Sequence, residues 1–155
     1  MAELDFVLFA DGATARPDGK LDIYGAGFNA IFAAKAPVQH PQLSVVIRVL
    51  MSVQEAESPH RLDLVLMSPD GPEIARAQAD IEPVPDEVRE QVPPGEKIGV
   101  GAVMNFSGLV FPSHGPYHLA VLWDSTELRQ PLYLKLSPLA PPGMPGQTGP
   151  QGQQT

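Results

Sequence analysis

The chain has 155 residues, of which 43% are hydrophobic and 18% are charged, a length and composition that suit one globular domain. Its 18 prolines and 14 glycines predict many turns and few long helices, and the absence of cysteine excludes disulfide scaffolds, thiolate zinc sites and cysteine nucleophiles. The formal net charge of −8 opposes binding to nucleic acid or to an anionic membrane surface.

The amino-terminal segment argues against export. It carries acids where a signal peptide has basic residues, and its apolar run is only as long as a strand. The sequence contains no run of about 18 apolar residues that could span a bilayer. We therefore expect a protein without membrane association, and we predict a cytoplasmic location.

Period-two alternation of apolar residues predicts strands in the first half of the chain. Residues 5–10, 21–26 and 31–34 are expected to be short strands, with a loop at residues 11–19. Gly25 and Gly27 indicate a bulge or a close backbone approach. Residues 43–53 carry the strongest pattern and predict a central core strand, whose inward face is Leu43, Val45, Ile47, Val49, Met51 and Val53.

The second half continues the pattern. Residues 62–67 and 73–81 are expected to pair through the turn signature at residues 68–71, and residues 97–106 form another strand in which bulges account for Gly99 and Gly101. Residues 82–96 hold five acids against Arg89 alone, and we expect an exposed loop there, with room for a helical turn at residues 86–91. After a turn near residues 124–126, the last strand has Leu132, Leu134 and Leu136 inward, and Pro131 within it indicates a sheet edge.

Residues 111–123 organise the predicted fold. Turn residues at 112–116 lead into a strand whose inward face is Tyr117, Leu119, Val121 and Trp123. A Gly-x-Tyr step suits the corner of a Greek-key sandwich, where the Tyr117 ring packs inward and its phenol bonds nearby backbone. We therefore predict an all-β fold: a single antiparallel Greek-key, immunoglobulin-like β-sandwich of about eight or nine strands over residues 1–136.

Residues 137–155 are expected to be a flexible tail rich in Gly, Pro and Gln. Beyond Ser137 the sequence has no charged and no aromatic residue, and glycine recurs every third residue from Gly143 to Gly152, as in collagen. A repeat this short cannot sustain a triple helix on its own. We therefore expect polyproline-II character without a fixed fold. A short trimer or partner tether is the alternative.

Several short motifs are distributed over residues 5–136. They are Ala10-Asp11-Gly12-Ala13, the segment 19–27, His40-Pro41-Gln42, the segment 105–109, Phe111-Pro112 and Gly115-Pro116-Tyr117. Together they resemble a family of small uncharacterised bacterial proteins. The resemblance implies a compact β-sandwich and a bacterial or phage source, and it brings neither an assigned activity nor functional residues.

The four histidines do not form a recognisable metal motif. His114 and His118 are four residues apart, but Gly115 and Pro116 between them exclude the helical face on which such a pair binds zinc. Exposed or capping roles are expected for them and for His40 and His60. We predict no metal and no cofactor.

Catalytic groups are equally sparse. Ser113 beside His114 is sequence adjacency, which is not triad geometry, and no Gly-x-Ser-x-Gly elbow occurs. Carboxylates could converge across a sheet as in glycoside hydrolases, and Asp63 and Asp124 would then be the pair to consider. Solvated outer-face charges are the preferred interpretation of both acids.

The outer faces of two predicted strands are more apolar than solvation requires, at Val46, Leu50, Val65 and Met67. Cover by loops of the same chain is the favoured explanation, and a contact patch for a partner or a second copy is the other.

We predict a non-enzymatic protein-interaction or assembly module of bacterial or phage origin, with a protein partner or self-association. The alternative is a sandwich that binds a carbohydrate or small ligand at its loop ends through Trp123, Tyr24 and His114. A hydrolase with acids converging across a sheet is the second alternative.

Overall fold

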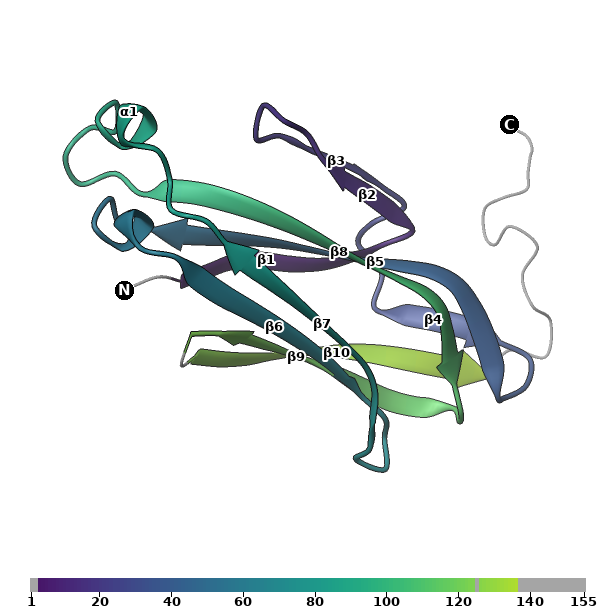
Figure 1. Cartoon of the computed structure of the whole chain (residues 1–155). Helices are drawn as coiled ribbons and strands as arrows, with labels where there is room; N and C mark the ends of the chain where they lie inside the picture. Colours follow the sequence, from purple (N-terminus) through teal and green to yellow (C-terminus); the bar gives the residue numbers. More distant parts are fainter. Residues whose placement is uncertain (1–2, 125, 137–155) are drawn as a thin grey trace, which may run out of the picture.

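The computed structural model describes residues 3–124 and 126–136, and these form an all-β fold (Figure 1). Two short helical elements interrupt the strands: the 3-10 helix η1 (Glu55–Glu57) and the α-helix α1 (Asp86–Arg89). The ten strands of the described residues are β1 (Glu3–Ala10), β2 (Gly12–Ala15), β3 (Leu21–Tyr24), β4 (Ala30–Ala33), β5 (Val38–Met51), β6 (His60–Met67), β7 (Glu73–Ile81), β8 (Ile98–Phe111), β9 (Gly115–Trp123) and β10 (Thr126–Leu136).

Two sheets share one hydrophobic core. The first has the strand order β1-β5-β8 and the second β4-β10-β9-β6-β7, and every pair is antiparallel except β4 with β10. One cluster of buried side chains contains residues from β1, β5 and β8 together with residues from β6, β9 and β10. The hydrophobic effect of this shared cluster therefore holds the two sheets together.

Alternation in β5 and β9 supplies the centre of this core. The inward residues of β5 from Leu43 to Met51 are at most 2% exposed, as the sequence predicts, and so are the four inward residues of β9 from Tyr117 to Trp123. Such a strand has one face fixed to the core, because a slip of one residue would turn every one of these side chains to the other face.

The Tyr117 corner forms as predicted. The Tyr117 phenol donates to the Ser113 carbonyl at 2.6 Å and accepts from the Ser113 amide at 3.2 Å. Its ring is fully buried and meets Phe111 edge-on at 5.1 Å between centroids. The corner thus joins the end of β8 to the start of β9 while satisfying a buried hydroxyl.

A small hairpin covers the outer face of the three-stranded sheet. Strands β2 and β3 pair with each other, and their Ala13 joins Ala10 and Val46 in a second buried cluster, with Leu21 and Ile23 packed against it. Val46 is 0% exposed, so the favoured explanation, cover by the same chain, is confirmed for this residue.

The glycines of β8 serve this packing. The pairing of β8 with β5 runs without interruption from Ile98 to Ser107, so the predicted bulges at Gly99 and Gly101 are wrong. A Cβ on Gly101 would lie 2.9 Å from the Leu21 side chain, and one on Gly99 would lie 2.2 Å from the Arg48 guanidinium. Glycine at these positions therefore lets side chains lie directly on the strand.

Other boundaries also differ from the prediction. Residues 12–15, expected in a loop, form β2, and the pairing of β5 passes over Pro41, which has no amide hydrogen to donate. Ten strands are therefore found within the described residues instead of eight or nine. The strand that contains Pro131 is not an edge strand, because β10 lies between β4 and β9 in the sheet. At Pro131 itself only β9 is paired among the described residues, since β4 pairs with residues 133–136.

The predicted tail and the predicted absence of a membrane span remain to be compared with the described residues. The predicted tail, residues 137–155, and its alternative role as a tether lie outside the described residues. Among the residues that the structure describes, no helix has the length and apolar character needed to cross a bilayer.

Candidate functional site

Three connections meet near one end of the core, and we call them the loop end: residues 52–59 with η1, residues 82–97 with α1, and Asp124 after β9 (Figure 1). Backbone bonds tie them together. The Val84 amide donates to the Ala56 carbonyl at 2.9 Å, and the Asp124 amide donates to the Arg61 carbonyl at 3.3 Å. Segments distant in sequence therefore form one surface.

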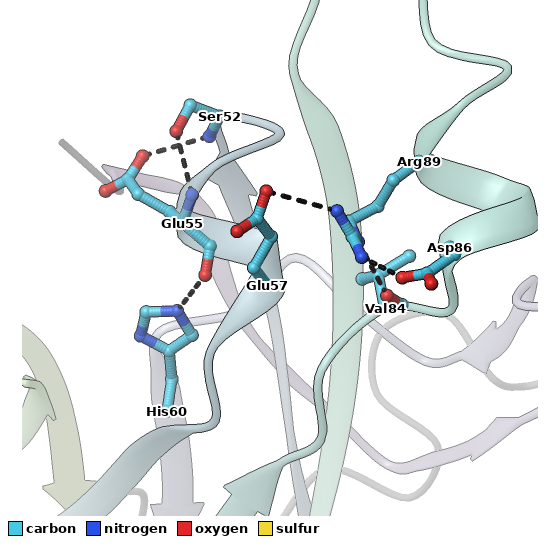
Figure 2. Close-up of polar contacts among 7 residues, drawn as sticks. All are labelled: Ser52, Glu55, Glu57, His60, Val84, Asp86 and Arg89. Atoms are coloured by element: carbon cyan, nitrogen blue, oxygen red, sulfur yellow. Dashed lines mark hydrogen bonds and ion pairs between the residues drawn. The ribbon is translucent and has the colours of Figure 1, made fainter.

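The first connection is shaped by a reciprocal pair of hydrogen bonds. The Ser52 amide donates to the Glu55 carboxylate at 2.9 Å, and the Glu55 amide donates to the Ser52 hydroxyl at 3.1 Å (Figure 2). This is the capping-box arrangement, which satisfies amides at the start of a helical turn. The bond from the Ser52 amide holds the pKa of Glu55 below its usual value.

His60, the first residue of β6, connects η1 with Asp124. Its Nε2 lies 2.7 Å from the Glu55 carbonyl oxygen (Figure 2) and its Nδ1 lies 2.8 Å from the Asp124 carboxylate. The ring stacks on buried Trp123 at 5.1 Å between centroids. Because both partners are acceptors, the doubly protonated imidazolium satisfies both contacts at once.

The charge state of His60 follows from these contacts. Burial alone lowers the pKa of the imidazole, but the bonds to the Glu55 carbonyl and to Asp124, with the negative charges of both carboxylates, outweigh it. The net result is a pKa raised above 6.5. The contacts of His60 with the two connections therefore favour its charged imidazolium over the neutral ring.

Arg89 fastens α1 to η1. Its guanidinium donates to the Val84 carbonyl at 3.0 Å, lies 3.2 Å from the Glu57 carboxylate and pairs with Asp86 (Figure 2). The side chain is only 18% exposed. The segment, expected to be an exposed loop with room for a helical turn, is mostly exposed and contains the short helix α1, which is held against η1.

The outer surface of this segment remains accessible. Val88 is 48% exposed, although it lies directly before Arg89. Four carboxylates are exposed and have no ion pair with any residue that the structure describes: Glu82, Glu87, Glu90 and Glu96. The segment thus combines a backbone held by Arg89 with an exposed apolar side chain and with acidic side chains that have no ion pair among the described residues.

The loop end has two open pockets. One, of about 360 Å³, has mostly charged and polar lining residues, and we call it the polar pocket; it is lined by Pro59, His60, Arg61, Asp80, Glu82 and Asp124. The other, of about 370 Å³, lies between residues 52–54 and residues 92–97 and is mainly apolar. Asp124 borders the first pocket in a left-handed conformation with φ of 53°, which acidic residues tolerate better than most. Within the described residues, no group of three or more His, Asp or Glu side chains has the geometry of a metal site.

The three predicted ligand contacts lie in different surroundings. Trp123 is 2% exposed beneath His60, so its burial contradicts a direct role in contacting a ligand. Tyr24 is 61% exposed on the β2–β3 hairpin, with its ring against Gly12. His114, half-buried in the turn before β9, donates from Nε2 to the Ala33 carbonyl at 3.0 Å.

The remaining chemical candidates have structural partners. Asp63 lies 3.3 Å from the Arg61 guanidinium and does not line the polar pocket, whereas Asp124 does. His40 meets Phe111 edge-on, and burial lowers the pKa of its imidazole. The acids that share the pocket with Asp124 are Asp80 and Glu82, which no sequence motif singles out.

Sequence signals for the loop end were uneven. The spacing Ser52-x-x-Glu55 is a capping-box signature, a local pattern that favours a helical turn at η1. The contacts of His60 with Asp124 and of Arg89 with Glu57 join residues far apart in the chain, so no local sequence pattern predicts them.

Comparison with known proteins supports the resemblance noted in the sequence. No curated protein matches the chain. The crystal structure of the C-terminal domain of wzt aligns with a TM-score of 0.44 and 11% identity, over 88% of this chain and 74% of that one. A family model described as a family of unknown function, DUF6941, matches residues 5–135. Since this match covers most of the sequence, the chain belongs to the DUF6941 family.

Proposed function

We propose that the chain is a non-enzymatic protein-interaction or assembly module that contacts its partner through the loop end. One observation carries the proposal: Arg89 fixes α1 against η1 while neighbouring Val88 remains 48% exposed. An apolar side chain on a fixed backbone loses little conformational entropy on binding, which is how a preorganised surface gains affinity.

The surroundings of Val88 support this role. Exposed Glu87 in α1 and Glu90 directly after it have no ion pairs among the described residues, so they add no ion-pair energy to folding. An apolar centre with a charged rim is the usual composition of a protein interface.

The use of the histidines supports the non-enzymatic part of the proposal. Both ring nitrogens of His60 and the Nε2 of His114 are engaged by groups of the fold. A general base needs a free nitrogen within reach of the proton that it removes, and these contacts would have to break first. We propose a cytoplasmic location for the module on the sequence grounds given above.

Affinity purification from the native source with matched baits tests the proposal. The baits are the wild-type chain, Val88→Arg on α1 and Val110→Arg on β8; the two valines are 48% and 52% exposed, so both changes place the same charge on a similar surface. We expect a specific set of partners to be retained by the wild type and Val110→Arg and lost by Val88→Arg. Partners retained by Val88→Arg would contradict the proposal.

The polar pocket favours a second candidate function, the binding of a small polar ligand such as a carbohydrate. Arg61, Asp80 and Glu82 offer donors and acceptors at one opening of about 360 Å³. A ligand that binds there stabilises the fold by mass action, so a thermal-shift screen of sugars should give a concentration-dependent rise that Asp80→Asn removes. No shift with any sugar would leave the interaction module as the better proposal.

We also propose that the arrangement of the two sheets is of the Greek-key, immunoglobulin-like type. Its support is the Tyr117 corner, where the phenol bonds backbone four residues upstream. Tyrosine corners of this kind occur at sheet crossings of immunoglobulin-like sandwiches.

A further inference from the structure

The apolar pocket of the loop end exposes apolar surface next to the core. Its floor includes Val53 and Val92, which pack against the main core and are only partly buried. Pro93 and Pro94 form one wall in a turn closed by the Glu96 amide donating to the Pro93 carbonyl at 3.1 Å. An apolar group seated here would extend the core outward and remove further apolar surface from water.

The size of the pocket limits its occupant. About 370 Å³ is near the lower end of the roughly 300–1,000 Å³ that ligand sites span. One large side chain of a peptide segment fits this space. Gln54 stands at the rim as an exposed side chain without a capping bond to η1.

The charge around the pocket indicates which residues should flank the apolar side chain of that peptide segment. Glu96 lines the pocket, and Glu87 and Glu90 precede it on the same connection; all three are exposed and have no ion pair among the described residues. Lys97, the cation among the lining residues, is paired with Glu3 at 2.9 Å. Glu96 therefore leaves uncompensated negative charge at the rim, and Glu87 and Glu90 add negative charge elsewhere on the same connection.

The same charges disfavour occupants from this chain. A second copy carries a net charge of −8 and would be repelled, and the segment 138–155 has no charged residue to complement the rim. We infer that the apolar pocket receives a basic segment of a partner protein, in which one large apolar side chain is flanked by Lys or Arg. This inference rests on the proposed function and names the chemistry of its partner.

Selection of a random peptide library on the full-length chain tests the inference. We expect the enriched peptides to combine a Leu, Ile, Met or aromatic residue with neighbouring Lys or Arg. One enriched peptide is then synthesised and titrated against the wild type and variants, and its contacts are mapped by NMR shifts of the backbone amides.

Two matched pairs of variants separate the pocket from the charge. Gln54→Trp fills the pocket from its rim, and Gln78→Trp places the same side chain on an exposed position of β7. We expect Gln54→Trp to weaken binding roughly tenfold or more, as for loss of a central anchor, and Gln78→Trp to leave it unchanged. The variant E87Q/E90Q/E96Q should weaken binding more than D22N/D70N/E127Q, which changes the net charge equally at exposed positions elsewhere.

The outcomes distinguish the inference from the function on which it rests. Enriched peptides without basic residues that still perturb Val53, Val88 and Val92 would overturn the basic partner and leave the interaction module standing. Equal weakening by both charge variants would also overturn it, because the effect would then come from net charge. No enrichment, or perturbations confined to other surfaces, would overturn both.

Discussion

His60 connects η1 with Asp124, and because these contacts raise the pKa of its imidazole, we expect the stability of the loop end to depend on pH. A pKa raised on folding contributes stability that is complete below the unfolded value of 6.5 and is lost as the pH rises through the folded value. In the neutral ring one nitrogen carries no proton, so one of the two acceptors, Glu55 carbonyl or Asp124, loses its donor.

Asp124→Asn tests this connection. Asparagine also tolerates the positive φ of position 124, so the change removes mainly the charge. We expect the difference in unfolding free energy between wild type and variant to be larger near pH 6 than near pH 8. Urea denaturation at both pH values measures this difference in unfolding free energy. The lowered pKa of His40 makes stability rise with pH instead, but it affects wild type and variant equally and cancels in the difference. Asp70→Asn, in an exposed turn, is the control, and an unchanged pH dependence in Asp124→Asn would refute the role of His60.

Tyr117→Phe tests the corner. The ring still fits, but the Ser113 carbonyl loses its donor and the Ser113 amide its acceptor. We expect a loss of about 1–3 kcal/mol in unfolding free energy, the usual cost of leaving buried polar groups unpaired. Tyr133→Phe, on an exposed tyrosine of β10, should change stability by less than about 0.5 kcal/mol. Equal effects of the two changes in denaturant titrations would show that the Tyr117 hydroxyl does not stabilise the corner.

Strands with strict alternation were predictable element by element. In β5 and β9 every second residue is a large apolar group, and burial of that face leaves one consistent arrangement. Strand β2 was missed because Gly12 and Ala13 resemble a turn, and its pairing with β3 depends on packing over Val46. Local strand propensity does not predict packing contacts between residues that are far apart in the sequence.

The helix α1 at the candidate site likewise depends on distant contacts that a local sequence pattern does not predict. The Pro85-Asp86-Glu87 step suits a helix start, and a helical turn was allowed there, but four residues do not form a stable helix on their own. The contacts of Arg89 with Glu57 and Val84 supply the missing stability from another part of the chain. The position of the site therefore could not be derived from the sequence pattern.

Arg89→Ala should release α1 without unfolding the core. We expect faster amide hydrogen exchange at Val84, Glu90 and Val92, whose amides are bonded within the loop end, and unchanged exchange in β5 and β8. Arg129→Ala, which removes an exposed pair with Glu127, is the control and should change neither region. Exchange at these three amides as slow as in the wild type would mean that Arg89 does not hold the segment.

Across the whole molecule, stability and proposed binding are separated in space. The buried side chains of both sheets form one cluster, and the loop end is attached to it through Ala56 and partly buried valines and is held in addition by hydrogen bonds and ion pairs around Arg89 and His60. The loop end also carries much of the acidic excess of the chain. A surface can change there at little cost to the core, as is usual for loops that carry function on a rigid scaffold.

Direct contact at α1 is the claim on which the account depends, and site-specific photo-crosslinking in cells of the native source tests it. A photoreactive amino acid is placed at position 88 on α1 or, as a control, at position 110 on β8, since Val88 and Val110 are similarly exposed. We predict a covalent adduct with the same partner from position 88 and none from position 110. Adducts from position 110 with none from position 88 would contradict the account.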